Sequence, residues 1–119
     1  MKCLIINGNS RKGNTWRLTE LIKENLKKLD VVMEFEEIHL KDINLPFCLG
    51  CSLCFRKGHI YCPHNEIIQR IMDKIEECNG VIFAAPTYNR QIPALTKNLV
   101  DHLCFMLHCP RYFDKTALV

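Results

Sequence analysis

A cluster of cysteines is the part of this sequence with the clearest chemistry. Four of the chain's eight cysteines have the spacing C-x2-C-x2-C-x7-C, and they are Cys48, Cys51, Cys54 and Cys62. Cysteines at consecutive three-residue steps let one loop present their thiolates to the same side, and a further cysteine after a short gap closes the coordination sphere. This spacing favours an iron–sulfur cluster over zinc, which two C-x2-C pairs across a longer gap more often bind. A structural zinc site is the alternative.

A polar loop near the N-terminus, residues 8–15, is typical of an anion-binding site. Its sequence is Gly8-Asn9-Ser10-Arg11-Lys12-Gly13-Asn14-Thr15. Backbone N–H groups at the start of a helix, helped by the helix dipole, hold phosphate well. The loop matches neither the Walker pattern nor G-x-G-x-x-G. We predict a phosphate site here; the alternative is an ordinary polar loop before a capped helix.

A second loop, Pro86-Thr87-Tyr88-Asn89, could contact a flat heterocycle. Free backbone N–H and C=O groups would pair with the polar edge of the ring, and Tyr88 could pack against its face. The alternative is a turn with a surface tyrosine.

Apolar runs and helical periodicity predict the elements that position these loops. We expect buried strands at residues 2–7 and 81–85, an edge strand with one wetter face at 31–38, and the start of a fourth strand at 116–119. Helices are expected after a cap at Asn14 or Thr15, after a cap at Asn65, and with Pro93 in a first turn. The order is that of a doubly wound parallel α/β sheet, in which ligands bind at the carboxyl ends of the strands. The loops at 8–15, 40–63 and 86–91 should therefore converge.

Several other residues have simple structural interpretations. The first helix carries an apolar stripe of Leu18, Leu21, Ile22, Leu26 and Leu29. Cys3 and Cys78 are interpreted as core residues, and Lys97, Asn98 and Asp101 as a solvated helix face. His59 and His64 flank Cys62 and are interpreted as bystanders; the alternative is that one of them replaces a cysteine as ligand. Cys104 and Cys109 are at non-ligand spacing, and we assign them no role.

Length and composition limit the class of protein. A chain of 119 residues predicts one domain, and a hydrophobic content of 48% is ample for a core. The net charge of +3 without a long basic run gives no indication of nucleic-acid binding. No apolar stretch is long enough to span a membrane, and the N-terminal apolar run is too short for a signal peptide, so we expect a cytoplasmic protein.

With these loops in place, the chain resembles the flavodoxin-like NAD(P)H-dependent FMN reductases, and more narrowly the iron–sulfur flavoproteins. The family's phosphate loop G-S-x-R-K-x-G-N-T is similar to residues 8–15, with Asn9 at the usual Ser and one residue fewer. Its P-x-Y segment is matched by Pro86-Thr87-Tyr88, and its L-K-N-h-h-D pattern by residues 95–101 with Thr96 inserted.

The resemblance implies cofactors and site residues. FMN would contact Asn9, Ser10, Arg11, Gly13, Asn14, Thr15, Pro86, Thr87, Tyr88 and Asn89. A 4Fe–4S cluster near the flavin would be held by Cys48, Cys51, Cys54 and Cys62. Residues 1–119 would form a flavodoxin-like FMN-binding domain with a cysteine-rich insert at 40–63. Because relatives continue for a fourth and fifth strand and a closing helix, this domain would be truncated within its fourth strand.

The resemblance also implies a function. The protein would be an oxidoreductase that moves electrons between NAD(P)H, or a carrier protein such as ferredoxin, and a redox partner or small-molecule acceptor. Relatives favour a homodimer or homotetramer. The alternatives are a flavin-free, zinc-stabilised α/β binding module, a plain FMN reductase without a cluster, and a chain that has no function by itself.

Overall fold

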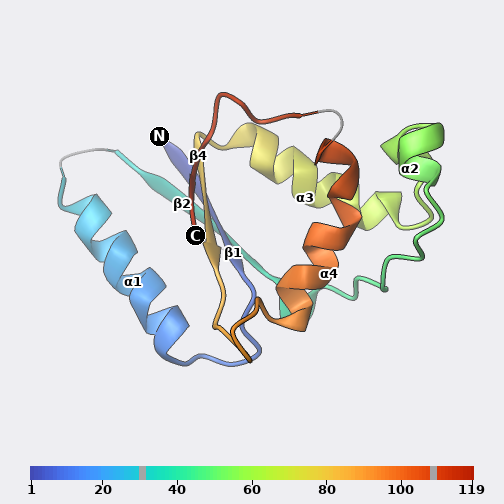
Figure 1. The fold of residues 1–119 in the computed structure, drawn as a ribbon. Coiled ribbons are helices and arrows are strands. Elements are labelled where there is room, and N and C mark those ends of the chain that lie inside the picture. Colours follow the sequence, from blue (N-terminus) through green and yellow to red (C-terminus); the bar gives the residue numbers. More distant parts are fainter. Residues whose placement is uncertain (30–31, 108–109) are drawn as a thin grey trace.

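A parallel sheet forms the centre of the computed structural model, which describes residues 1–29, 32–107 and 110–119. Its strands are β1 (Lys2–Asn7), β2 (Glu34–His39), β3 (Gly80–Ala84) and β4 (Thr116–Leu118). Within the described residues the sheet has four strands, all parallel, in the order β2-β1-β3-β4 (Figure 1). This is the doubly wound arrangement that the sequence predicts, with the strand order of a flavodoxin-like sheet.

Helices cover both faces of this sheet. Figure 1 shows α1 (Asn14–Lys27) on one side, with α3 (Asn65–Glu77) and α4 (Ala94–His102) on the other. Successive residues of β1 point to opposite faces. Leu4 and Ile6 pack in the cluster that contains the α3 and α4 side chains, whereas Cys3 and Ile5 belong to the cluster that Ile22 of α1 contacts. Because both faces are covered, β1 is buried from Cys3 to Asn7, as its apolar run predicts.

The strand β2 is an edge strand, and its charged residues explain why it is partly wet. Glu36 pairs with Lys2 and with Lys74 of α3, while Glu37 pairs with Lys23 of α1. The strand begins at Glu34, later than predicted; Val31, where we placed its start, lies outside the described residues, and Val32 is 85% exposed. The prediction of an edge strand is confirmed, with its start misplaced.

The helix starts differ from the predicted caps by one residue. Asn14 and Asn65 are the first residues of α1 and α3, and the cap positions are Gly13 and His64, neither with a side-chain cap hydrogen bond. Pro93 is the cap residue of α4 rather than part of its first turn. A backbone cap needs no Ser, Thr or Asn side chain, so the residue type alone pointed one position too late.

The predicted stripe of α1 is only partly buried. Ile22 packs towards the sheet and Thr19 is buried, but Leu18, Leu21 and Leu29 are each more than half exposed. An apolar hollow between α1 and the β3–β4 side of the sheet is lined in part by Leu18, Ile22 and Leu118. The helix therefore covers this face incompletely, which leaves part of its stripe in contact with solvent.

Short helical turns complete the chain between β2 and α3 and after α4. They are η1 (Leu40–Asp42), α2 (Leu53–Arg56), η2 (His59–Tyr61) and η3 (Cys104–Leu107). The predicted long loop at 40–63 thus contains three one-turn elements rather than one irregular segment. Among the described residues, we find no helix with the length and apolar character needed to cross a membrane.

Candidate functional site

Two of the three predicted loops lie side by side at the carboxyl ends of β1 and β3 (Figure 1). The backbone N–H of Gly8 donates to the carbonyl of Ala84, with an N···O distance of 2.8 Å. Gly8 also packs directly on the first turn of α4, because a β-carbon at this position would overlap Oγ1 of Thr96. The end of β1 is therefore fixed between the end of β3 and the start of α4.

Positive side chains surround the N-terminal end of α1. Arg11, Lys12, Gly13, Asn14 and Arg17 line a shallow hollow there. A helix N-terminus with several cations around it attracts a phosphate group through its free N–H groups and its dipole. Ser10 is exposed beside this hollow without lining it, and Thr15 lines the apolar hollow on the sheet side of α1 instead.

Arg17 is a cation that the sequence reasoning missed. It lies three residues after Asn14, which is one helical turn, so both side chains reach the same end of α1. This helical spacing was the signal that could have identified it, once Asn14 was placed inside the helix rather than at its cap.

Buried polar atoms without partners lie at the end of β1, in the loop that follows it and at the start of α4. Asn7, Asn9 and Thr96 are between 0% and 5% exposed, and within the described part of the chain Oδ1 of Asn7, Nδ2 of Asn9 and Oγ1 of Thr96 have no hydrogen-bond partner. A buried polar atom without a partner is costly, and such atoms are characteristic of a place where a ligand supplies the missing bond. The amide of Asn9 and the cations at the α1 terminus together fit a phosphorylated polar ligand such as FMN. Of these buried atoms, the sequence identified only that of Asn9.

The segment after β3 forms a two-residue hairpin turn. Tyr88 and Gln91 exchange backbone hydrogen bonds of 3.0 and 2.9 Å, and the residues between them, Asn89 and Arg90, have φ values of 49° and 61°. Positive φ at both central positions is the geometry of a type I′ turn, which arginine adopts only at a cost. The backbone groups of Tyr88 are therefore already paired, contrary to our prediction that they are free. The Tyr88 side chain is 52% exposed and available to cover a ring.

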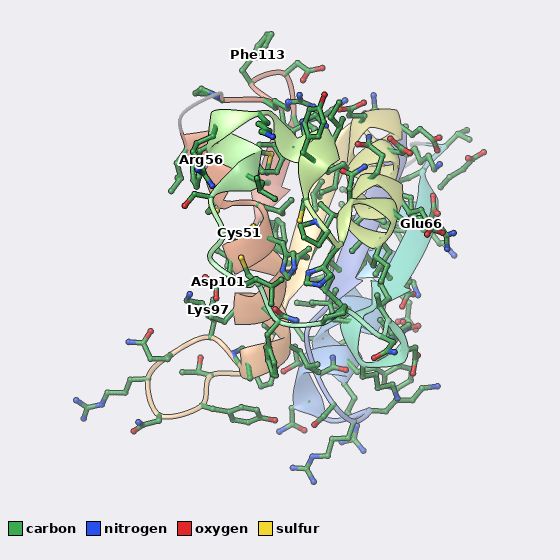
Figure 2. The ribbon with its side chains drawn as sticks, turned by 90° about the vertical axis from the view of Figure 1, so that its right-hand side faces the viewer. Cys51, Arg56, Glu66, Lys97, Asp101 and Phe113 are labelled. Atoms are coloured by element: carbon green, nitrogen blue, oxygen red, sulfur yellow. The ribbon has the colours of Figure 1, made fainter. Side chains whose placement is uncertain are left out.

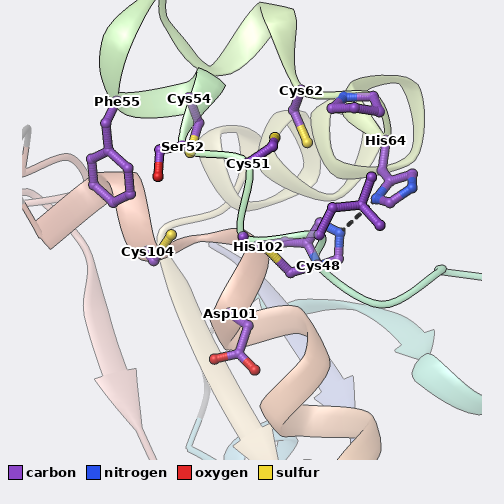
Figure 3. A pocket seen from close by; sticks show the side chains of 13 residues that line it. Cys48, Cys51, Ser52, Cys54, Phe55, Cys62, His64, Asp101, His102 and Cys104 are labelled. Carbon is purple, nitrogen blue, oxygen red and sulfur yellow. Dashed lines mark hydrogen bonds between the residues drawn. The ribbon is translucent and has the colours of Figure 1, made fainter.

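The predicted metal ligands line a second hollow, which lies against the C-terminal half of α4. Cys48, Cys51, Cys54 and Cys62 all contribute to its wall (Figure 3). Cys48 and Cys51 are exposed, while Cys54 and Cys62 are half-buried. Gly50 has a φ of 62°, a left-handed conformation that glycine adopts without strain, so the chain can turn sharply between these two exposed cysteines.

The donor set of this hollow fits a metal centre, although its thiols are not gathered at ligand positions. Within residues 1–29, 32–107 and 110–119 no three His, Cys, Asp or Glu side chains form a preformed metal site. Thiolates are the preferred ligands of both iron–sulfur clusters and zinc. The exposed loop that carries Cys48 and Cys51 would need to close onto Cys54 and Cys62 for all of these cysteines to bind one centre.

Side chains from the end of α4, from η3 and from the residue before α3 complete the lining of the cysteine hollow. His64, Asp101, His102 and Cys104 line it together with the cysteine loop. Nδ1 of His64 lies 3.0 Å from Nε2 of His102, and Nδ1 of the buried His102 lies 2.9 Å from the carbonyl oxygen of Asn98. His64 therefore lines the hollow, whereas His59 stacks on Phe105 with ring centroids 5.1 Å apart; that neither is a metal ligand stays a prediction.

The prediction of a solvated face on α4 holds for Lys97 and Asp101, which form an exposed ion pair, but not for Asn98. Figure 2 shows Lys97 and Asp101 on the same side of α4, with Cys51 beyond Asp101 towards the end of the helix. Asp101 lines the cysteine hollow. Nδ2 of Asn98 donates to the carbonyls of Leu45 and Pro46, at 2.9 and 3.3 Å, and so ties the cysteine loop to the helix. These contacts join residues more than fifty positions apart, which no local pattern indicates.

Cys104 also lies in this hollow, although its spacing gave it no role. Burial, together with the neighbouring thiols of Cys54 and Cys48, raises the pKa of Cys104. Cys109 and His108 lie outside the described residues. The core positions predicted for Cys3 and Cys78 are confirmed, and burial raises the pKa of both thiols.

The prediction that all three loops converge at one edge of the sheet is wrong in part. The cysteine loop starts at the carboxyl end of β2, but no residue of 8–15 or 86–89 is among those that line the cysteine hollow in the described chain. Its cysteines lie further along α4 because Asn98 holds residues 45–46 against the middle of that helix. We call the region around Gly8 and the cation-lined N-terminus of α1 the cation-lined edge. It lies near the start of α4, whereas the cysteine hollow lies near the end of that helix.

This chain is similar in sequence to proteins from other organisms. An iron–sulfur flavoprotein of Archaeoglobus fulgidus is 40% identical over 101 residues, which cover 85% of this chain and 48% of that protein. An iron–sulfur flavoprotein of Methanocaldococcus jannaschii is 35% identical over 85% of this chain and 51% of its own length. The chain thus spans about half the length of the curated relatives that it matches.

Solved structures show the same fold at lower identity. The crystal structure of the azoreductase AzrA superposes with a TM-score of 0.69 at 21% identity, over 87% of this chain and 55% of that one. The flavoenzyme NAD(P)H:acceptor oxidoreductase FerB of Paracoccus denitrificans gives a TM-score of 0.60 at 21% identity, over 98% of this chain and 57% of that one. The family of NADPH-dependent FMN reductases matches residues 1–119, and this chain belongs to it.

Proposed function

We propose that residues 1–119 form an FMN-binding domain, with a cysteine-rich insert at 40–63, of an oxidoreductase that moves electrons between NAD(P)H or a carrier protein and an acceptor. The observation that carries the proposal is the cation-lined N-terminus of α1 beside the unpaired buried amide of Asn9. Family membership supports FMN as the ligand of that edge.

The proposed flavin site combines the two neighbouring loops. In this proposal Ser10, Arg11, Gly13, Asn14 and Thr15 hold the phosphate, and Asn9 donates its amide to the ligand. Arg11, Gly13 and Asn14 line the hollow at the N-terminus of α1, and we add Arg17 because it lines the same hollow, whereas Ser10 and Thr15 lie outside its lining. Pro86, Thr87, Tyr88 and Asn89 border the ring, and the exposed Tyr88 side chain shields one side of it from water. When bound, FMN supplies hydride and single-electron chemistry, and the role of these residues is to bind and orient it. No side chain is assigned as an acid or base.

The proposed second centre is a 4Fe–4S cluster held by Cys48, Cys51, Cys54 and Cys62. Their spacing, their place in one hollow and the name iron–sulfur flavoprotein carried by the relatives support this proposal. Such a cluster supplies single-electron transfer, with a potential that depends on hydrogen bonds to its sulfurs and on exposure. The acceptor is a redox partner protein or a small molecule.

The test is the UV–visible spectrum of the anaerobically purified chain before and after dithionite, with iron, sulfide and zinc measured on the same sample. Flavin bands together with a broad brown absorbance that bleaches are expected. Flavin bands without iron would leave a plain FMN reductase, and zinc without flavin would leave the zinc-stabilised module. A colourless chain that does not bind added FMN would contradict the proposal.

A further inference from the structure

Cys104 gives the cysteine hollow a fifth thiol. It lines the hollow with Cys48, Cys51, Cys54 and Cys62, and the thiols of Cys54 and Cys48 are its neighbours there. Figure 3 shows the Cys104 sulfur pointing towards the loop that carries Cys54. A 4Fe–4S cluster or a zinc ion takes four protein ligands, so the hollow holds one thiol more than the centre needs.

The segment that carries Cys104 is well anchored. Its neighbours Leu103 and Phe105 are 9% and 6% exposed and belong to the main core cluster. The ring of Phe105 is further fixed by the stacked His59. Cys54 also packs against this core cluster, but it lies on the single turn α2, which has no buried residue. Cys104 is therefore the thiol of this pair whose position depends less on the loop.

Two neighbouring thiols that line the same hollow can occupy one coordination position in turn. Exchange between them requires a small side-chain rotation rather than a movement of the sheet or of α4. Of the thiols that neighbour Cys104, that of Cys54 acts on it more strongly than that of Cys48, so the redundancy concerns the position of Cys54.

We propose that Cys54 and Cys104 share one ligand position of the metal centre, and that Cys104 supplies the thiolate when Cys54 does not. This inference rests on the metal site of the proposed function. As the metal–sulfur bond to Cys104 forms, its thiol proton passes to water and the bond to Cys54 is released or absent. The exchange changes no oxidation state.

Serine variants of the full chain test this sharing. Cys54→Ser, Cys104→Ser, the double variant and Cys51→Ser are reconstituted anaerobically with ferrous iron and sulfide, and iron and sulfide per chain are measured. Both single variants of the pair should retain most of the wild-type iron. The double variant and Cys51→Ser should show about a tenfold or greater loss of bound iron. The proposal would be overturned if Cys54→Ser binds as little iron per chain as the double variant.

A Co²⁺ titration separates this inference from the proposed function. The thiolate-to-cobalt charge-transfer band reports the number of bound thiolates without any cluster. If the wild-type chain binds Co²⁺ but no cluster, the cluster proposal fails. The shared ligand position is still supported in that case if Cys54→Ser keeps the wild-type band and the double variant loses part of it. If wild type shows no thiolate band and no cluster, both fail. Far-UV circular dichroism checks folding, and Cys104→Ala replaces Cys104→Ser if the latter misfolds.

Discussion

Gly8 and Thr96 are in direct contact, so that Gly8 has no room for a side chain. A β-carbon on Gly8 would overlap Oγ1 of Thr96 and would also lie 3.2 Å from Cβ of Ala85. The glycine is needed here for space, since its N–H must reach the carbonyl of Ala84 while α4 passes close by. The contact joins the ends of β1 and β3 to the first turn of α4.

Gly8→Ala should therefore lower the free energy of unfolding by about 1–3 kcal/mol, the usual cost of overpacking. The double variant Gly8→Ala/Thr96→Ala should recover most of this loss, because Oγ1 of Thr96 has no hydrogen-bond partner to lose in the described structure. Urea denaturation of both variants measures the effect. Gly13→Ala is the control, since the nearest atom to its new β-carbon is 4.0 Å away, at Nε of Arg11. Equal losses for Gly8→Ala and the double variant would contradict this explanation.

Arg17→Gln should weaken FMN binding by about tenfold or more, because a hydrogen bond to a charged group contributes about 1.5–3 kcal/mol. Riboflavin lacks the phosphate, so its affinity should be unchanged. Fluorescence titrations with both flavins measure the difference. Arg70→Gln is the control, as Arg70 is an exposed cation paired with Glu66 on α3. A similar loss for riboflavin would place Arg17 at the ring or in the fold rather than at the phosphate.

Asn98→Ala should release the cysteine loop from α4. The loss of its hydrogen bonds to the carbonyls of Leu45 and Pro46 should cost about 1–2 kcal/mol. Proteolysis within residues 40–63 should become faster, while cleavage elsewhere is unchanged. Lys97→Ala, at the neighbouring exposed position, should cost less than about 0.5 kcal/mol. If the two variants are equally stable, Asn98 does not anchor the loop.

Glu37 should make the stability depend on pH. Burial alone would raise its pKa, but the hydrogen bond and charge of Lys23, with His39 and Asn7, outweigh burial and hold the pKa of Glu37 below its ordinary value. A lowered folded-state pKa stabilises the protein above the unfolded value of about 4.3, and this contribution is lost as the pH falls through the folded value.

Glu37→Gln should therefore cost about 1–2 kcal/mol at pH 7 and progressively less as the pH is lowered from about 5 to 3. Urea denaturation at several pH values and constant ionic strength measures the difference from wild type. Glu66→Gln, in an exposed pair with Arg70, is the control and should show little change. A cost for Glu37→Gln that is the same at pH 3 and pH 7 would mean that the carboxylate charge is not the cause.

The sheet could be predicted from the sequence because its central strands are buried on both faces. Such strands contain continuous apolar runs, which can be recognised in the sequence alone. The runs are Leu4, Ile5 and Ile6 in β1 and Val81 and Ile82 in β3. The cysteine spacing could also be recognised in the sequence, because a single loop carries those residues. Helix starts at Asn14 and Asn65 were displaced by one position because their caps use no side-chain hydrogen bond.

The rest of the site depends on tertiary contacts. Cys104 joins the cysteine hollow only because α4 ends beside α2, and Thr96 borders the cation-lined edge only because α4 begins beside Gly8. Asn98 resembles a solvated residue in sequence, and its role follows from a loop more than fifty positions away. Contacts of this kind carry no periodicity or spacing that a single sequence displays.

The length of α4 has a consequence for the cation-lined edge and the cysteine hollow, which lie near its two ends. It has nine residues from Ala94 to His102, so its axis spans about 13 Å at 1.5 Å per residue. This rigid length fixes the distance between the cation-lined edge and the cysteine hollow, whatever residues occupy either loop. Residues in either of these two regions can therefore be replaced without changing the position of the other region. A single residue inserted within α4 would instead rotate Cys104 by about 100° and separate it from Cys54.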